Sequence, residues 1–305
     1  MTWRQMTRKR PANDLNHLTF GPSRGTQSPQ MAPFAPLPRS RPELMLYSAT
    51  INVMVKAARR AGRSLKRDLG EIEHLQVSLK GPANFVSLAD KRAEEILYQD
   101  LAKARPGYGF IGEEGGMREG SDKSHTWIVD PLDGTTNFLH GIPQFAISIG
   151  LAREGTVIAG VIYNPANDEL YIAERGKGAF LNDQRLRVAG RRQLNECVVA
   201  CGLPHIGRGD HEEFRREMTA IQDRVAGLRR FGAASLDLAF VAAGRLDGYW
   251  ERNLQSWDIA AGMLMVREAG GTVSDINTPG DALVTGDVVC GNEYVHGELV
   301  RILRK

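Results

Sequence analysis

The sequence has few cysteines, no long apolar run and only a small excess of positive charge. Its 305 residues include three cysteines, Cys197, Cys201 and Cys290. Because their number is odd and their spacing matches no zinc motif, we expect buried thiols in a reducing compartment, and hence a cytoplasmic protein without disulfides. No stretch approaches the roughly 18 uninterrupted apolar residues of a membrane-spanning helix, which excludes a membrane span.

The composition is that of an ordinary globular protein. Hydrophobic residues make up 42% of the chain and charged residues 25%. These fractions exclude fibrous, collagenous and wholly disordered proteins. The length predicts one large domain or two closely packed ones.

The first 44 residues differ in composition from the rest of the chain. They contain seven of the fourteen prolines, seven Lys or Arg residues and two acids, for a net charge of +5. The remaining residues have 32 basic and 34 acidic side chains, so a general nucleic-acid-binding body is not indicated. Without apolar periodicity, residues 1–44 are predicted to be disordered. They are either an extension without function, with translation starting near Met45, or a nucleic-acid-binding arm through Arg8-Lys9-Arg10.

The pattern of apolar residues predicts a mixture of helices and strands. Helices are expected over residues 44–65, 87–104, 210–225, 235–243, 257–269 and 294–303. Strands are expected over residues 109–112, 127–130, 145–152, 157–163, 169–173, 178–181, 198–202, 229–231, 248–251, 272–275 and 287–290. This order predicts a layered body with an α+β subdomain over 45–190 and an α/β subdomain over 191–305.

The segment Trp127–Asn137 concentrates the chemistry of the sequence. A buried strand reaches Asp130, and we expect Pro131 to stop it. Asp133 follows three residues after Asp130, and two carboxylates at this spacing suit a hard cation such as Mg²⁺. The same pattern also suits an Asp-rich turn that caps a helix, and the residues alone do not separate these interpretations.

Three further acids follow or begin predicted elements. Glu113 follows a short strand, Asp258 lies in the first turn of a helix, and Asp90 lies where it can cap another helix. Each has an ordinary structural explanation when taken alone. Spacing alone does not bring these regions together.

Taken together, three segments resemble the signatures of the inositol monophosphatase family. They are Gly112-Glu113-Glu114, Trp127–Phe138, and Trp257–Gly262 followed by Glu268–Gly271. The resemblance runs from about residue 45 to the end. It implies an α+β fold related to fructose-1,6-bisphosphatases, a layered α/β/α/β/α sandwich. It also implies a Mg²⁺-dependent phosphomonoesterase that is inhibited by lithium and forms a homodimer.

The resemblance also implies a role for each site residue. The metal ligands would be Glu113, Asp130, Asp133, Asp258 and the carbonyl of Leu132, with two or three Mg²⁺ ions. Thr135, hydrogen-bonded towards Asp90, would orient the attacking water together with Glu113. The phosphate would be held by the amides of Gly134 and Thr135. The substrate hydroxyls would be bound by Asp133, Gly232, Ala233, Ala234 and Glu251.

Two positions depart from the family pattern, and the substrate alcohol stays open. Asn84 stands where many relatives have aspartate, and the loop at Asp275-Ile276-Asn277-Thr278-Pro279 lacks the usual glycine pair. The segment Gly244–Glu251 resembles the bacterial inositol monophosphatases most closely, which favours myo-inositol 1-phosphate. Alternatives are histidinol phosphate, fructose 1,6-bisphosphate, a nucleotide 3′-phosphate, or a non-catalytic role in binding RNA or the transcription machinery.

Overall fold

The computed structural model describes residues 47–304, except 72–76, 82–83, 207–208 and 278–279. For residues 77–81 and 84–87 it describes the backbone alone. The expectations for residues 1–44, for the side chain of Asn84 and for Thr278-Pro279 therefore lie outside the described residues. None of the described helices is long and apolar enough to cross a membrane.

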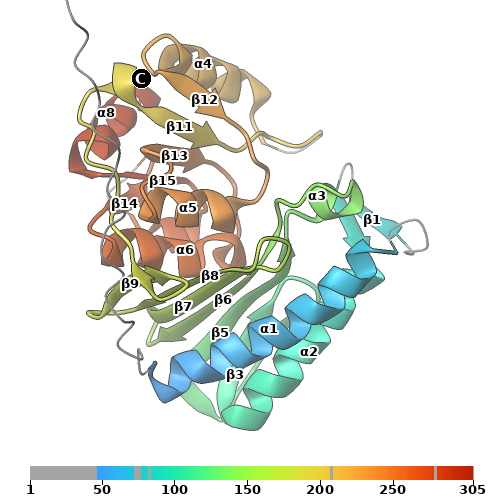
Figure 1. The fold of residues 1–305 in the computed structure, drawn as a ribbon. Helices are drawn as coiled ribbons and strands as arrows, with labels where there is room; N and C mark the ends of the chain where they lie inside the picture. The colour runs from blue at the N-terminus through green and yellow to red at the C-terminus, as the bar shows by residue number, and fades with distance from the viewer. Residues whose placement is uncertain (1–46, 72–76, 82–83, 207–208, 278–279, 305) are drawn as a thin grey trace, which may run out of the picture. The chain divides into compact units, whose positions relative to one another are not determined.

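The larger of the sheets has eight strands in the order β10-β9-β8-β7-β6-β5-β3-β4 (Figure 1). Its strands are β3 (Tyr108–Gly112), β4 (Gly116–Arg118), β5 (Asp122–Asp133), β6 (Ala146–Arg153), β7 (Thr156–Asn164), β8 (Glu169–Glu174), β9 (Gly178–Leu181) and β10 (Gln184–Arg185). Only β3 and β5 pair in parallel within this sheet; every other pair is antiparallel. A separate two-stranded sheet pairs β1 (Val77–Gly81) with β2 (Asn84–Ser87).

The smaller sheet has five strands in the order β12-β11-β13-β15-β14. Its strands are β11 (Val198–Cys201), β12 (Gly227–Arg229), β13 (Gly248–Glu251), β14 (Thr272–Asp275) and β15 (Val288–Gly291). β11 pairs in parallel with both β12 and β13, whereas β15 pairs antiparallel with β13 and β14.

The long helices form layers on both sides of each sheet. They are α1 (Ala49–Leu69), α2 (Leu88–Ala104), α4 (His211–Gln222), α5 (Ala234–Ala242), α6 (Ser256–Glu268) and α8 (Glu293–Leu303), with the short helices α3 (Thr135–Leu139), η2 (Leu194–Glu196) and α7 (Ala282–Thr285). α1 and α2 pack on one face of the larger sheet, and α6 packs on the other. α5 and α6 also contact the smaller sheet, whose far face is covered by α8. This order confirms the predicted α/β/α/β/α sandwich (Figure 1).

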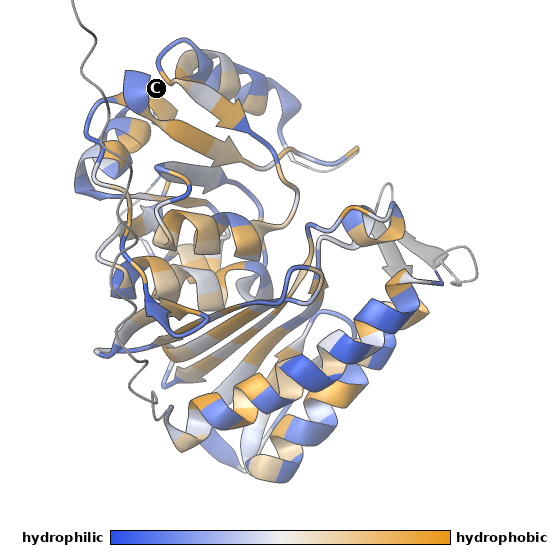
Figure 2. Cartoon of the chain, viewed as in Figure 1, coloured by the Kyte–Doolittle hydropathy of each residue, from blue (hydrophilic) through white to orange (hydrophobic). Residues whose placement is uncertain are grey.

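The residue pattern explains which helices lie in the middle. α1 is amphipathic, with apolar residues toward the sheet and charged residues outward, as Figure 2 shows by its alternating colours. α5 is apolar on nearly every side, and all its residues except Phe240 are buried. A helix that is hydrophobic all round is stable only where protein covers it on every side. The composition of α5 and α6 therefore places them between the two sheets.

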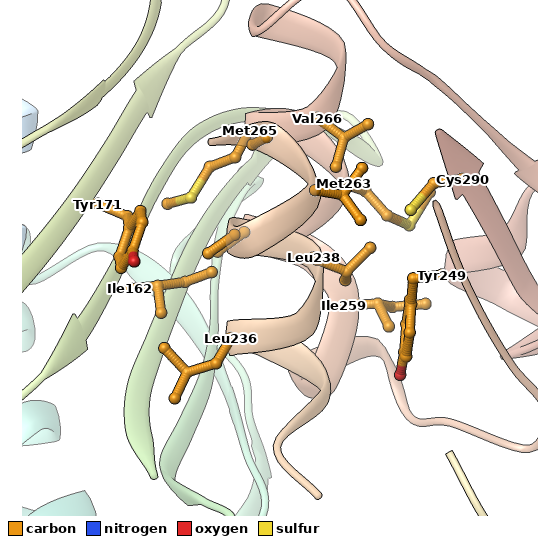
Figure 3. Packing of buried hydrophobic residues seen from close by; sticks show 14 of the residues in the cluster. Ile162, Tyr171, Leu236, Leu238, Tyr249, Ile259, Met263, Met265, Val266 and Cys290 are labelled. Atoms are coloured by element: carbon orange, nitrogen blue, oxygen red, sulfur yellow. The ribbon is translucent and has the colours of Figure 1, made fainter. Parts of the chain in front are cut away.

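Side chains from both sheets meet on these middle helices (Figure 3). Ile162 and Tyr171 of the larger sheet lie on one side, and Tyr249 and Cys290 of the smaller sheet lie on the other. Leu238 of α5 lies among the helix side chains between them. One continuous hydrophobic core thus joins the two sheets through α5 and α6.

Glycines allow α6 to approach its neighbours closely. Gly150 and Gly160 are paired on β6 and β7, and a Cβ atom on Gly160 would lie 3.0 Å from the Cα of Ala261. At the next position of the helix, a Cβ atom on Gly262 would lie 2.6 Å from the Cβ of Leu238. These contacts fix the position of α6 between the larger sheet and α5.

Most of the expected elements are present, with shifted ends. The strand expected over 229–231 is β12 at Gly227–Arg229, because the chain leaves the sheet at Arg230 to enter the left-handed turn at Gly232, where φ is 80°. β1, β2 and β4 were not anticipated. The division into subdomains near residue 190 stays a prediction, and it coincides with the passage from β10 of the larger sheet to β11 of the smaller one.

Two glycines inside helices give a test of this packing. Gly262→Ala improves helix propensity but forces a methyl group against Leu238, so we expect a loss of about 1–3 kcal/mol in the free energy of unfolding. Gly297→Ala in α8 is the matched control, since its Cβ would meet nothing within 4 Å. We expect it to stabilise by up to about 1 kcal/mol. Urea denaturation of both variants measures the difference, and a stabilised Gly262→Ala variant would contradict the packing described here.

Candidate functional site

The sequence-predicted site residues converge on one cavity of about 380 Å³. Those that line it are Glu113, Asp130, Leu132, Asp133, Gly134, Thr135, Gly232, Ala234, Glu251 and Asp258. They come from the turn after β3, the end of β5, the start of α3, the segment before α5, the end of β13 and the start of α6. Asp90 and Ala233 do not line the cavity. Both lie behind residues that line it, and each is only 1% exposed to solvent.

A β-bulge places Asp130 and Asp133 on the same side of β5. Residues three apart in a regular strand point to opposite faces. Here Asp130 pairs with Ser148 and Asp133 with Ala146, so three residues of β5 are matched by two of β6. The extra residue turns both carboxylates to one side. The expectation that Pro131 stops the strand was wrong: the bulge absorbs the proline, which donates no hydrogen bond, and β5 continues to Asp133.

The turn after β5 needs glycine and orients a hydroxyl group. Gly134 has a left-handed φ of 88°, and a Cβ atom there would lie 2.8 Å from the carbonyl oxygen of Gln144. The Thr135 hydroxyl lies 3.1 Å from Oδ1 of Asp90 and 3.0 Å from the carbonyl oxygen of Leu132, and it can donate to either. The sequence-expected link between Thr135 and Asp90 is thus present.

Backbone amides bind three of the carboxylates that line the cavity. Asp133 accepts hydrogen bonds from the amide and the hydroxyl of Ser235 in the first turn of α5, with an amide distance of 2.7 Å. Asp258 accepts from the amide of Gln255 at 2.7 Å in the capping box of α6. Asp130 accepts from the amide of Leu132 at 2.9 Å. Helix N-termini and turn amides carry partial positive charge, which offsets part of the charge of these acids.

Asn137 joins the turn after β5 to the segment before α5. Its side-chain amide donates to the carbonyl oxygens of Gln144 at 2.8 Å and of Phe231 at 2.7 Å, and it lies 3.4 Å from that of Gly232. It is 7% exposed. Sequence reasoning did not assign this role, although Asn137 ends the signature segment in which the two aspartates lie.

The acids in the cavity repel one another. Burial raises the pKa of Asp130 well above its usual range, and the neighbouring charges of Glu113, Asp133 and Asp258 add to the effect. Burial also raises the pKa of Asp133 and that of Asp258. Such a set of carboxylates favours the binding of cations, because a cation relieves both the burial cost and the repulsion.

The donors are hard oxygen atoms that reach the cavity from separate elements. In the part of the chain that the structure describes, no three His, Cys, Asp or Glu side chains gather closely enough to form a compact metal-binding cluster by themselves. Mg²⁺ seldom has such a cage and is bound by a few carboxylates together with water and substrate phosphate. The donor set fits Mg²⁺ on these grounds.

Comparison with known proteins identifies the family. The sequence pattern of the inositol monophosphatase family matches residues 46–305. The inositol-1-monophosphatase of Mesorhizobium japonicum is 60% identical over 261 residues, which are 86% of this chain and 98% of the relative. The chain belongs to the inositol monophosphatase family. This confirms the resemblance found in the sequence.

Two further relatives carry a different name. The crystal structure of the extragenic suppressor protein suhB from Bartonella henselae has 57% sequence identity and a TM-score of 0.83, and the match covers 85% of this chain and 99% of that one. The Nus factor SuhB of Escherichia coli is 41% identical over 245 residues, 80% of this chain and 92% of the relative. The family thus includes proteins named for phosphatase activity and proteins named for other roles.

Sequence reasoning missed Arg230, one of the arginines that line the cavity. A Cβ atom on Gly232 would lie 2.3 Å from Nη1 of Arg230, so the guanidinium group lies over this glycine. Its charge lowers the pKa of both Asp133 and Glu251, against the larger effect of burial. The pair Arg229-Arg230 just before the glycine turn was the available signal.

Other residues that line the cavity were also missed. They are Leu203, Pro204, His205, Phe214, Trp250 and Trp257, together with Glu217 and Arg252. Arg252 is fixed there, with Nε 2.8 Å from Oε1 of Glu217 and Nη1 3.1 Å from Oδ2 of Asp287. His140 does not line the cavity, and its Nδ1 lies 2.8 Å from the carbonyl oxygen of Thr136.

The pKa of Glu251 makes the stability of the metal-free protein depend on pH. Burial raises this pKa from 4.5 to about 7. Between these values the folded protein holds a proton that the unfolded chain has lost, so Glu251 increasingly opposes folding as the pH rises. The test compares the unfolding free energies of the parent and of Glu251→Gln in excess chelator. We expect the parent's value minus the variant's to fall by on the order of 1–3 kcal/mol between pH 5 and pH 8.

Denaturation at several pH values measures this difference. The exposed Glu196→Gln variant is the control, since its side chain lies outside the cavity. A relative stability that rises with pH would mean that Glu251 is ionised more readily in the folded protein than in the unfolded chain.

Proposed function

We propose that this chain is a Mg²⁺-dependent phosphomonoesterase that hydrolyses myo-inositol 1-phosphate to inositol and phosphate. The observation that carries the proposal is the convergence of four carboxylates from three distant segments on one cavity that also contains Thr135 and Glu251. The 60% identity to an inositol-1-monophosphatase supports the same substrate.

The metal ligands are Glu113, Asp130, Asp133, Asp258 and the carbonyl of Leu132, as the resemblance implies. Four carboxylates and a phosphate dianion carry about six negative charges. Three Mg²⁺ ions would neutralise this charge, whereas two would leave a net charge of about −2. When bound, the ions lower the pKa of coordinated water and stabilise charge on the phosphoryl oxygens.

Thr135 and Glu113 orient the attacking water. When the Thr135 hydroxyl donates its proton to Oδ1 of Asp90, its oxygen is left as an acceptor for one O–H of the water. The Glu113 carboxylate can accept the other proton. Because Asp90 is buried behind the cavity, it controls the direction of the Thr135 hydroxyl without contacting substrate.

The amides of Gly134 and Thr135 hold the phosphate, since they begin α3 and line the cavity. The displacement is in line and has no covalent enzyme intermediate. The bond from the water oxygen to phosphorus forms as the opposite bond to the alcohol oxygen breaks, and a water molecule protonates the leaving alkoxide.

The alcohol is bound on the α5 side of the cavity. Glu251 lies at the end of β13 and accepts a hydrogen bond from the hydroxyl of Tyr249, which fixes its orientation. A carboxylate held in this way can accept hydrogen bonds from two neighbouring hydroxyls of a polyol. Asp133, Gly232 and Ala234 complete this side, and Arg230 adds a donor to it.

A role in the transcription machinery is the second candidate. Its support is the 41% identity to a protein named Nus factor SuhB. The cytoplasmic location, the homodimer and lithium inhibition stay predictions. A turnover panel of inositol, histidinol, sugar and nucleotide phosphates tests the proposal, and the absence of turnover on the whole panel would favour the second candidate.

Asp258 gives a test of the metal site. Asp258→Asn removes one of the repelling charges, so we expect the protein to be equally or more stable in chelator, yet less stabilised by Mg²⁺. Activity should be lost in chelator, restored by Mg²⁺ in the parent, and restored much less in the variant. Thermal melting over a Mg²⁺ titration measures the coupling.

The exposed Asp223 at the end of α4 provides the matched control, Asp223→Asn. Equal Mg²⁺ stabilisation of the parent and Asp258→Asn would contradict the role of Asp258 as a ligand, and substantial turnover in excess chelator would contradict metal dependence.

Glu251 separates substrate recognition from chemistry. We expect Glu251→Gln to lower kcat/KM for inositol 1-phosphate roughly 10-fold or more, because a charge-assisted hydrogen bond contributes about 1.5–3 kcal/mol. Hydrolysis of a simple aryl phosphate and the Mg²⁺ dependence should change little. Equal losses on both substrates would place Glu251 in the catalytic machinery instead.

A further inference from the structure

Glu94 is a buried acid that the mechanism above does not use. It lies on α2, is 3% exposed and faces the turn between β3 and β4. Its Oε2 accepts a hydrogen bond from the amide of Glu114 at 2.7 Å, and its Oε1 accepts one from the amide of Gly115 at 2.6 Å. Both carboxylate oxygens thus bind successive amides of one turn.

The turn is shaped around this carboxylate. A Cβ atom on Gly112 would lie 2.4 Å from Oε2 of Glu94, and one on Gly115 would lie 2.7 Å from Oε1. Neither glycine has a left-handed φ, so backbone conformation does not require them. They are instead required by the close approach of Glu94 to the backbone.

This turn carries Glu113. The amide of Glu113 donates to the carbonyl oxygen of Val129 in β5 at 3.3 Å, and the next two amides donate to Glu94. Three successive amides of the turn therefore donate hydrogen bonds within the protein. The side chain of Glu113 on this turn lines the cavity. Two charge-assisted bonds are stronger than the water contacts that an open turn would make.

We propose that Glu94 is a positioning residue for Glu113: it holds the turn that directs the Glu113 carboxylate into the cavity. The proposal rests on the proposed function, in which Glu113 binds Mg²⁺ and orients water. Groups that orient a metal ligand typically change metal affinity or activity by 10–100-fold when they are altered. Glu94 acts on the backbone that bears the ligand rather than on the ligand itself.

Glu94→Gln tests the proposal, because it keeps the shape of the side chain but directs an NH₂ group at one of the two amides. We expect the Mg²⁺ concentration for half-maximal thermal stabilisation to rise about 10–100-fold. We expect kcat to fall at saturating Mg²⁺ with little change in KM. Glu95→Gln is the matched control, since Glu95 is the next residue of α2, is exposed and accepts only from Gln99 at 2.8 Å among the hydrogen bonds described.

A double-mutant cycle separates positioning from general stability. If Glu94 acts through Glu113, Glu94→Gln should change Mg²⁺ half-saturation less than about twofold in a Glu113→Gln background. An equal effect in both backgrounds, or no effect in the parent, would overturn the proposal.

A second variant tests the same proposal if Glu94→Gln does not fold. Gly115→Ala places a methyl group against Oε1 of Glu94 and displaces the same turn from the other side. It should weaken Mg²⁺ stabilisation in the same direction, and unchanged Mg²⁺ stabilisation would overturn the proposal. If the parent itself shows no Mg²⁺ stabilisation and no phosphatase activity, the proposed function fails rather than the role of Glu94.

Discussion

Repulsion among the carboxylates of the cavity is the constraint on which the site depends. Asp130, Asp133 and Asp258 share one cavity with Glu113, and burial raises the pKa of each of the three aspartates. The charges of neighbouring acids raise the pKa of Asp130 and that of Asp258 further. The fold offsets this cost with backbone amides from a strand bulge and from the first turns of α5 and α6. These amides belong to fixed parts of the backbone, so they keep the carboxylates together in an arrangement that favours cation binding.

The layered architecture brings those amides to the cavity. α5 and α6 lie between the two sheets because they are apolar on nearly all sides. Their N-termini meet the end of β5, and the glycine contacts at Gly160 and Gly262 leave α6 little freedom to shift. Packing of the core therefore sets the position of the Ser235 amide that binds Asp133 and the position of Asp258 in the first turn of α6.

In the proposed function, the two sides of the cavity have separate roles. The carboxylates, Thr135 and the amides at the start of α3 would bind phosphate and metal, and all of them except Asp258 of α6 lie close to the ends of β3 and β5. Glu251 at the end of β13 and Arg230 before α5 line the same cavity, and in the proposed function they would contact the alcohol. Relatives with different names can thus share the first group of residues while differing in what the second group meets.

The local pattern of apolar residues was sufficient to predict most helices and strands, because its periodicity indicates which face of each element is buried. α2 ends at Ala104 and β13 spans Gly248–Glu251, both as expected. Pro131 was misread because a proline stops a regular strand, whereas a bulge needs no hydrogen bond at that position. β4 is too short for a recognisable alternation, and the position of β12 depends on the turn that follows it.

The sequence by itself determined the family, the layered fold and the identity of the acids, since their signature segments are contiguous. Only the tertiary structure decided that Glu113, Asp130 and Asp258 line one cavity, that Arg230 lies over Gly232, and that Glu94 holds the turn of Glu113. Glu94 binds amides 20 and 21 positions away, and Glu113 and Asp258 are more than 100 positions apart in the sequence. Such contacts form only when α2, α5 and α6 pack on the larger sheet, and no local pattern of residues records that packing.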